Sequence, residues 1–172
     1  TSTVTNDNSS SPDVVLGAVD GDNSGAGNEA SLTVNSTGNI TIGAVDLWDS
    51  GSGGGTLIAN FDTDGGESET LSLGSLTVGG LSIFGNADKD EIFTKDNSGT
   101  LETKSSGSNI SLSNLGTVTF QDNVTSAGGI SISDVTSLVI DTNTKSGNIT
   151  LTASSGDITI NSNIGSIAAA DN

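Results

Sequence analysis

The sequence predicts an all-β protein of the β-solenoid type, with a β-sandwich or jelly-roll filament subunit as the alternative. Three observations support this prediction. Apolar and polar residues alternate in short runs, no segment carries a 3.6-residue apolar stripe, and apolar pairs recur about 20 positions apart in the C-terminal half. Because one coil of a solenoid is too small to bury a core alone, its aliphatic side chains must stack on those of the next coil.

Seven stretches show the alternation most clearly, each bounded by Gly, Asn, Asp or Ser. They are 31–34, 39–42, 70–73, 109–112, 129–132, 148–151 and 157–160. This pattern is typical of a strand with one buried face. We therefore expect each stretch to be a strand.

Two apolar pairs set the expected period. One recurs twice at a spacing of 20, as Val118/Phe120, Leu138/Ile140 and Ile158/Ile160. The other recurs at 20 and then 19, as Ile110/Leu112, Ile130/Ile132 and Ile149/Leu151. We therefore expect Val118, Leu138 and Ile158 to lie side by side on adjacent coils. A sandwich also has strands every 8 to 12 residues, but it has no reason to repeat strand types at a fixed offset.

A longer signature, apolar-x-apolar-x-x-apolar, indicates how the chain is organised upstream. It occurs four times, starting at Ile40, Leu71, Ile110 and Ile130. The first two spacings, 31 and 39, exceed one period, so we expect projecting insertions near 49–70 and 85–99. Residues 1–12 show no periodicity and are expected to be a flexible lead or linker, with 13–172 as a single β-solenoid domain.

The composition fits thin, closely stacked layers. Ser, Thr, Asn and Gly make up 91 of the 172 residues, and aromatic residues make up 3%. Small polar side chains tolerate close coil spacing, and Gly or Asn accepts the backbone angles of sharp corners. Four aromatic residues lie beside the expected insertions: Trp48, Phe61, Phe84 and Phe93. We expect them to cap the core there, in preference to stacking on a sugar ring.

Several classes of function are excluded by the residues that the chain lacks. Without Cys, His or Arg, it cannot form Ser-His-Asp or Cys-His nucleophiles or Cys/His zinc sites, and we expect no enzymatic activity. Four lysines against 21 acidic residues give a net charge of −17, which excludes a nucleic-acid partner. No apolar run approaches the ~20 residues of a membrane span, so no membrane insertion is expected. With neither a signal peptide nor an initiator Met, the chain is interpreted as a processed piece of something larger.

Parts of the chain resemble a known family of repeats. The stretches GNITLTASSGDITINSN (147–163), LGTVTFQDNVTSAGGISIS (115–133) and GNITI (38–42) are similar to repeats of filamentous-haemagglutinin-like and other β-helical bacterial surface adhesins. The resemblance is best over residues 109–163. It implies a right-handed parallel β-helix, secretion, and an elongated adhesin or matrix fibre without catalysis.

Two acidic loops are candidate calcium sites, since calcium prefers clustered oxygen ligands, and Asp88, Asp90 and Glu91 form a slightly weaker third cluster, because Lys89 neutralises part of its charge. Asp20, Asp22 and Ser24 alternate before a glycine, as at the start of a calcium loop, but position twelve is Ser31, so the loop is not an EF-hand. Glu29 is a candidate later ligand in this first loop. The second loop offers the ligands Asp62, Asp64, Glu67 and Glu69. The alternative interpretation, solvated acidic turns, stays open for both.

The expected function is a non-catalytic structural module of a secreted or cell-surface fibre or adhesin, self-associating or continuing into neighbouring repeats. One alternative is a calcium-dependent module that binds glycans or another cell surface through the acidic loops. The other is a donor-strand-exchanged, pilin-like filament subunit that donates residues 14–19 as a strand to its neighbour. An extracellular or cell-surface location is expected in each case.

Overall fold

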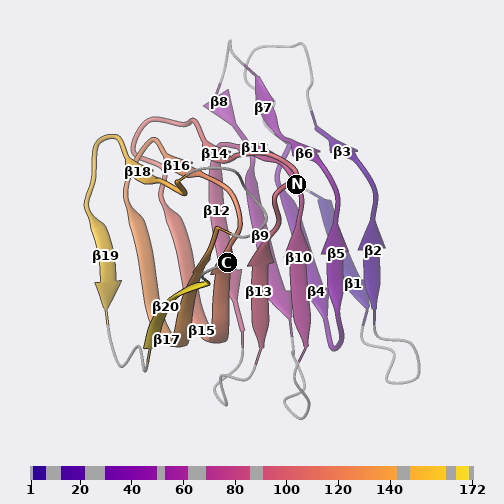
Figure 1. Ribbon diagram of the computed structural model, residues 1–172. Coiled ribbons are helices and arrows are strands. Elements are labelled where there is room, and N and C mark those ends of the chain that lie inside the picture. Colours follow the sequence, from indigo (N-terminus) through magenta and orange to yellow (C-terminus); the bar gives the residue numbers. More distant parts are fainter. Residues whose placement is uncertain are drawn as a thin grey trace.

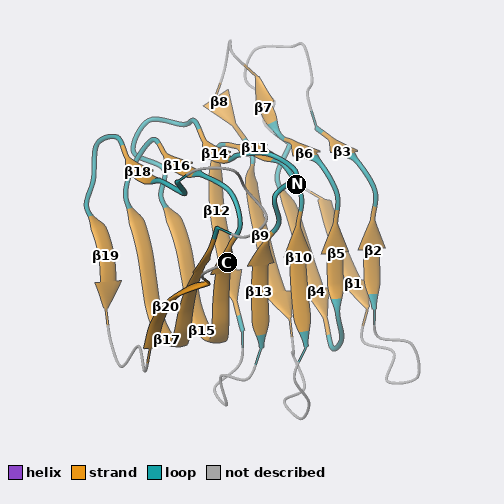
Figure 2. Ribbon diagram, viewed as in Figure 1, coloured by secondary structure: helices purple, strands orange, loops and turns teal. Residues whose placement is uncertain are grey.

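In a computed structural model, the chain folds into parallel strands stacked in three ladders (Figure 1). The structure describes residues 2–6, 13–21, 30–49, 53–61, 69–85, 91–142, 148–161 and 166–170. Within these residues every regular element is a strand, joined by short loops (Figure 2). The all-β prediction is therefore confirmed.

The three ladders form three faces, which we name A, B and C. Face A contains β1 (Ser2–Asn6), β4 (Leu32–Ser36), β9 (Thr56–Phe61), β12 (Gly80–Phe84), the first parts of β15 (Ile110–Phe120) and β17 (Ile130–Asp141), and β19 (Ile158–Asn161). Face B contains β2 (Val14–Leu16), β5 (Ile40–Ile42), β10 (Thr70–Leu73), β13 (Ile92–Lys95), the later parts of β15 and β17, and β20 (Ser166–Ala170). Face C contains β3 (Val19–Asp20), β6 (Val45–Asp46), β11 (Leu76–Val78), β14 (Leu101–Thr103), β16 (Val124–Ser126) and β18 (Leu151–Ala153).

The chain visits the faces in the order A, B, C and then returns to A. We call each such passage a coil, numbered from the N-terminus. Coils 1 to 6 have a strand on every face, and coil 7 consists of β19 and β20 in the described part of the chain. Figure 1 shows the coils side by side, from β2 and β3 at the right to β19 at the left. This arrangement is compatible with a β-helix.

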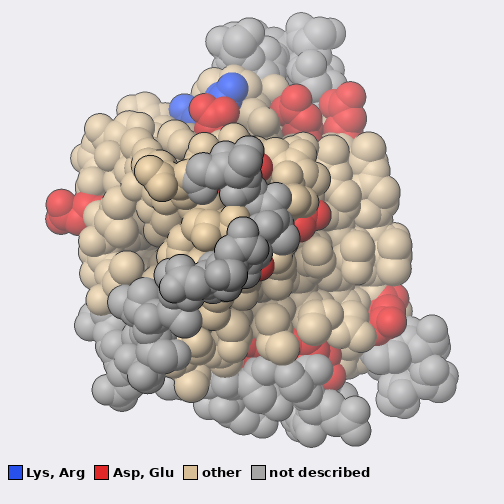
Figure 3. Space-filling model, viewed as in Figure 1, with Lys and Arg blue, Asp and Glu red and all other residues tan. Residues whose placement is uncertain are grey.

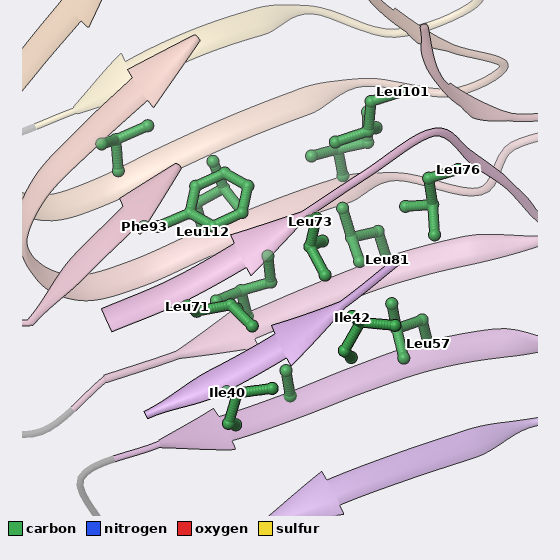
Figure 4. Packing of buried hydrophobic residues seen from close by; sticks show 14 of the residues in the cluster. Ile40, Ile42, Leu57, Leu71, Leu73, Leu76, Leu81, Phe93, Leu101 and Leu112 are labelled. Atoms are coloured by element: carbon green, nitrogen blue, oxygen red, sulfur yellow. The ribbon is translucent and has the colours of Figure 1, made fainter. Parts of the chain in front are cut away.

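Alternate residues of the strands point inward and form columns of apolar side chains. In one column on face B, Ile40, Leu71, Phe93, Val118 and Leu138 are each in register with the next. All five are buried. Figure 4 shows such side chains from successive strands meeting in the interior. This burial supplies the main stabilising term, at roughly 25 cal/mol for each Å² of apolar surface removed from water.

Asparagines at the corners tie successive coils together. The Oδ1 atom of Asn39 accepts the backbone N–H of Thr70 at 2.9 Å, and that of Asn109 accepts the N–H of Gly129 at 2.7 Å. Asn123 repeats this contact to Thr150 at 3.0 Å. Each bond satisfies a backbone donor that a sharp corner would otherwise leave without a strand partner.

The predicted 20-residue register holds between coils 5 and 6 and fails beyond them. Val118 pairs with Leu138, as expected, but Ile158 pairs with Ile130 on face A. Leu151 pairs with Val124 on face C, so its predicted equivalence to Ile132 is also wrong. Residues 142–150, between β17 and β18, lengthen coil 6 and change which strands fall 20 positions apart.

The longer signature marks a strand, a corner and the start of the next strand, but at two different corners. The copies at Ile40 and Leu71 pair with each other across the corner from face B to face C. The copies at Ile110 and Ile130 pair across the corner from face A to face B. The spacing of 31 is therefore one coil, whereas the spacing of 39 compares positions that are not equivalent.

Because the signature marks two different corners, each of the predicted insertions, 49–70 and 85–99, includes a strand of the stack. The stretch 49–70 contains β9, which pairs with β4 and β12, and the stretch 85–99 contains β13, which pairs with β10 and β15. Residues 50–52 and 62–68 of the first stretch and residues 86–90 of the second lie outside the described residues. The expected flexible lead, 1–12, likewise contains β1, which pairs with β4 over its whole length.

The antiparallel alternative fold is wrong for the described residues. Every strand pair there is parallel except the short pair β7 (Trp48–Asp49) and β8 (Gly53–Gly54). Residues 14–16, part of the segment expected as a donated strand, pair with β5 of their own chain. Sandwiches and jelly rolls are built from antiparallel sheets, so the parallel pairing of the described strands excludes both folds for these residues.

The register of coil 7 can be tested by cross-linking, because the chain contains no natural cysteine. Ser131 and Thr159 are in register on neighbouring strands, and both carry outward side chains. With strands about 4.8 Å apart, the double variant Ser131→Cys/Thr159→Cys should be cross-linked by a short bifunctional thiol reagent. Mass spectrometry of the digested protein detects the link. The control, Val139→Cys/Thr159→Cys, tests the register expected from the 20-residue repeat and should not be linked.

Candidate functional sites

The first predicted calcium loop is described only at its start. Asp20 is exposed on face C, where it is in register with Asp46 of the next coil, also exposed. Asp46 uses Oδ1 to accept the backbone N–H of Trp48 at 3.1 Å. Asp22, Ser24 and Glu29 lie outside the described residues. The structure therefore brings one predicted ligand beside a carboxylate that the prediction did not include.

The second predicted loop is described at Glu69 alone. Its side chain is 9% exposed, and its carbonyl oxygen accepts the backbone N–H of Ile92 at 2.8 Å. Glu69 is therefore turned largely into the protein. Asp62, Asp64 and Glu67 lie outside the described residues. In the described part of the chain, no group of three or more acidic side chains is placed to hold a metal ion.

A second buried glutamate stands beside Glu69 in the ladder. Glu91 directly precedes β13, as Glu69 precedes β10, and it is fully buried. Its carbonyl oxygen accepts the backbone N–H groups of Gly116 and Thr117. Gly85 makes room for its carboxyl group, because a Cβ atom at that position would lie 2.8 Å from Glu91 Cδ. The two glutamates therefore belong to the corner between faces A and B rather than to an exposed loop.

Lys95 is the most unexpected side chain of the interior. It occupies an inward position between Leu73 and Phe120 and is fully buried. Its Nζ donates to the carbonyl oxygen of Asp96 at 2.6 Å and lies 3.4 Å from Asp96 Oδ1. The aliphatic stem of the side chain thus fills the apolar column, while the ammonium group is bonded at the corner.

Asp96 joins this lysine to the loop that follows. Burial alone would raise the pKa of Asp96, but hydrogen bonds from the Ser98 hydroxyl and backbone N–H, together with the Lys95 ammonium, lower this pKa below its usual value. The lower folded-state pKa means that the carboxylate stabilises the folded state fully above the unfolded-state pKa of about 3.9. This contribution is lost as the pH falls through the folded-state value.

The variant Asp96→Asn should therefore be less stable than the natural chain at pH 7 and equally stable in acid. Because Asp96 is 37% exposed, solvent screening limits the difference in unfolding free energy to about 1 kcal/mol or less. Urea titrations from pH 7 down to pH 2 measure it. A difference that stays constant below pH 4 would show that the charge on Asp96 is not its cause. Asp134→Asn, at an exposed position, is the matched control.

The outer surface is dominated by short polar side chains in columns. On face A, Asn60 donates to Asn35 Oδ1 at 2.7 Å, and Asn35 donates to Thr5 at 3.3 Å. Figure 3 shows acidic side chains scattered over the visible face rather than gathered into one patch. Phe61 and Phe93 are buried, as expected for core-capping aromatic residues, whereas Phe84 is 38% exposed.

A shallow groove of about 200 Å³ lies near the C-terminal end of the stack. Its lining residues are Asn109, Gly129, Ile130, Ser131, Gly156, Asp157 and Thr159. The glycines keep it open while the coils approach closely, since a Cβ atom at Gly156 would lie 2.8 Å from the backbone nitrogen of Gly129. The groove presents hydroxyl, amide and carboxylate groups and no described cationic side chain.

The two ends of the stack form a second kind of candidate site. Ile158 and Ile160 of coil 7 are in register with buried Ile130 and Ile132, yet they are 43% and 42% exposed. At the opposite end, Val4 packs against the core and is only partly buried. The 20-residue repeat predicts Ile158 and Ile160 inside the stack, because alternation reveals which side of a strand is apolar and not whether another coil covers it.

The fold thus defines an all-β protein of stacked parallel strands with a continuous apolar interior. No protein-family model, curated protein sequence or solved structure matches the chain. In the described part of the chain, no helix is long and apolar enough to cross a membrane.

Proposed function

We propose that the chain is a right-handed parallel β-helix and acts as a non-catalytic structural module of a secreted or cell-surface fibre or adhesin. The observation that carries the proposal is the register of the apolar columns, which runs through three parallel ladders from one end of the molecule to the other. The right-handed sense is supported by the strong preference of parallel crossover connections for that hand.

The surface supports a passive role. Many outward positions beside the core columns carry short hydroxyl and amide side chains. In one column of face A, Thr33, Ser82, Ser111 and Ser131 carry hydroxyls, and Ile58 of coil 3 interrupts them. Lys95, a buried ionisable side chain of the interior, is bonded through Nζ to the carbonyl oxygen of Asp96 at a corner. Such a surface favours an extended scaffold over a reaction site, and the resemblance of residues 109–163 to surface-adhesin repeats favours an extracellular location.

Localisation on the producing cells tests this function. Antibodies raised against the purified chain should label intact cells or the fibres around them. Deletion of the gene segment that encodes residues 1–172 should abolish cell attachment or fibre formation. Labelling only after the cells are permeabilised would contradict the proposal. A deletion strain with unchanged attachment and fibres would do so as well.

A calcium-dependent module for glycans or cell surfaces is the second candidate, favoured by the adjacent exposed carboxylates of Asp20 and Asp46. If calcium binds the folded state and not the unfolded state, the thermal unfolding midpoint should be higher in millimolar calcium than in the presence of a chelator. At a hundredfold excess over the Kd, the gain is about 2.7 kcal/mol. The double variant Asp20→Asn/Asp46→Asn should lose this gain, whereas Asp134→Asn should keep it. Equal melting curves with calcium and chelator would remove the candidate.

A further inference from the structure

We propose that the C-terminal end of the stack is a docking site for coil 1 of a second copy of this chain, joined head to tail and in register. This inference rests on the structural role proposed above and names its partner. A stack of seven coils at about 4.8 Å each is only about 30 Å long. Contacts between the ends of successive copies would extend this stack into a fibre.

The apolar columns define how the copies would meet. On face A, one inward column runs through Leu112, Ile132 and Ile160, and its N-terminal member is Val4. Ile160 is 42% exposed and Val4 only partly buried, because among the described residues no coil packs beyond Ile160 or before Val4. A second copy placed in register beyond coil 7 would set its Val4 on Ile160, as Ile132 now stands on Leu112. On face B, β2 of that copy would lie along β20.

The backbone polarity of the two ends also matches. At both ends of face A, the residue at the inward position of the earlier coil donates its N–H to a carbonyl oxygen of the later coil. Ser2 donates to Ser31 at the first contact, and Ile130 donates to Asp157 at the last. Continuing this alternation, Ile158 and Ile160 direct their N–H and C=O groups beyond the last coil, and Thr3 and Thr5 direct theirs beyond the first. In the described part of the chain, no strand lies outside β1 or β19. Unpaired edges with matching polarity are templates for strand addition.

A head-to-tail contact is heterologous, so each added copy presents a fresh end and the assembly grows as a filament. Charge opposes this growth. The chain carries a net charge of −17, and exposed carboxylates lie at both ends, with Asp13 and Asp20 on coil 1 and Asp157 on coil 7. Salt screens such repulsion over a Debye length of about 10 Å at 0.1 M. Assembly should therefore strengthen as sodium chloride is raised.

Directional cross-linking tests the proposed contact. Thr3 and Thr159 belong to the same outward column of face A, at its first and last positions. Purified Thr3→Cys chain and purified Thr159→Cys chain, mixed in 0.5 M sodium chloride with a short bifunctional thiol reagent, should yield a covalent heterodimer. Each variant alone should yield at least tenfold less dimer. Cross-linking only between identical variants, or no cross-linked product at any salt concentration, would overturn the docking proposal. Neither result bears on the proposed surface location, which the antibody experiment tests separately.

A blocking variant distinguishes docking from general association. Ile160→Lys adds a charge to the exposed end, and it should weaken self-association at least tenfold in sedimentation experiments while leaving the unfolding midpoint nearly unchanged. The control Phe84→Lys makes the same change at a 38% exposed position in the middle of the stack and should associate like the natural chain. Both substitutions make the net charge less negative by one, so charge affects both variants alike. If Ile160→Lys associates more weakly and Phe84→Lys does not, the end of the stack is the site of contact. Equal association of both variants would contradict it.

Discussion

Replacing Gly55 with alanine is expected to destabilise the protein by about 4 kcal/mol or more, the range of severe single substitutions. Gly55 lies where coil 3 begins, and its carbonyl oxygen accepts the backbone N–H of Gly79 at 2.7 Å. A Cβ atom at Gly55 would stand 1.6 Å from the carbonyl oxygen of Ala30 on the preceding coil. Since that obstacle is backbone, relief requires the coils to separate, which breaks pairing on both sides.

Urea unfolding measures the effect of this substitution. The matched control is Gly17→Ala, because a Cβ atom at Gly17 meets nothing within 4 Å. Gly17→Ala should leave the midpoint unchanged or raise it slightly, since alanine restricts the unfolded chain. If the two variants unfold at the same urea concentration, close coil contact at Gly55 does not limit stability.

The strand content could be predicted from the sequence because alternation is a local property. The inward residues Ile110, Leu112, Ile130 and Ile132 were all identified by their spacing of two, and their mutual register followed from the 20-residue repeat. Coil 5 is short enough for this repeat to hold, because only residues 121–123 separate β15 from β16, whereas residues 142–150 separate β17 from β18. Both coils make the corner between faces A and B within one continuous strand, at Asn114 and Asp134, whose φ angles of 56° and 52° suit asparagine and aspartate better than most residues.

The register of the other coils could not be predicted because corner length varies from coil to coil. Ile130 and Ile158 are equivalent although 28 positions separate them, while Ile110 and Ile130 are 20 apart. A ladder constrains only the strands, so residues added at a corner change the spacing without disturbing the core. A fixed period therefore misplaces every strand beyond a longer corner, and it makes β9 and β13 look like insertions.

The buried charges could have been found from the same alternation. Glu91, Phe93 and Lys95 are spaced by two, so a strand that buries Phe93 turns all three inward. Composition argued against this, since glutamate and lysine are seldom buried. The corners resolve the conflict, because the strand ends at Lys95 and its ammonium group reaches the carbonyl oxygen of Asp96. The exposure of apolar side chains at the ends of the stack could not be predicted, because the pattern within a strand does not reveal whether another coil packs beside that strand.

The second large effect is expected at Leu112, in the middle of the stack. Leu112 is fully buried on β15, between Ile83 of coil 4 and Ile132 of coil 6. Leu112→Ala should cost about 2 to 5 kcal/mol, because the removed atoms lose their contacts and the rigid ladders on either side limit collapse into the cavity. Against a typical total of 5 to 15 kcal/mol, this loss should lower the urea midpoint strongly and leave the slope of the transition unchanged.

Ser111→Ala provides the control for Leu112, because Ser111 lies next to it on the same strand with its side chain on the outer surface. Its register partners, Ser82 and Ser131, also carry outward hydroxyls. This change should shift the unfolding free energy by no more than about 0.5 kcal/mol, as is usual for surface substitutions. If Ser111→Ala destabilised the chain as much as Leu112→Ala, the inward and outward faces of β15 would have to be exchanged. The column that joins Ile83 to Ile132 would then not be the source of stability.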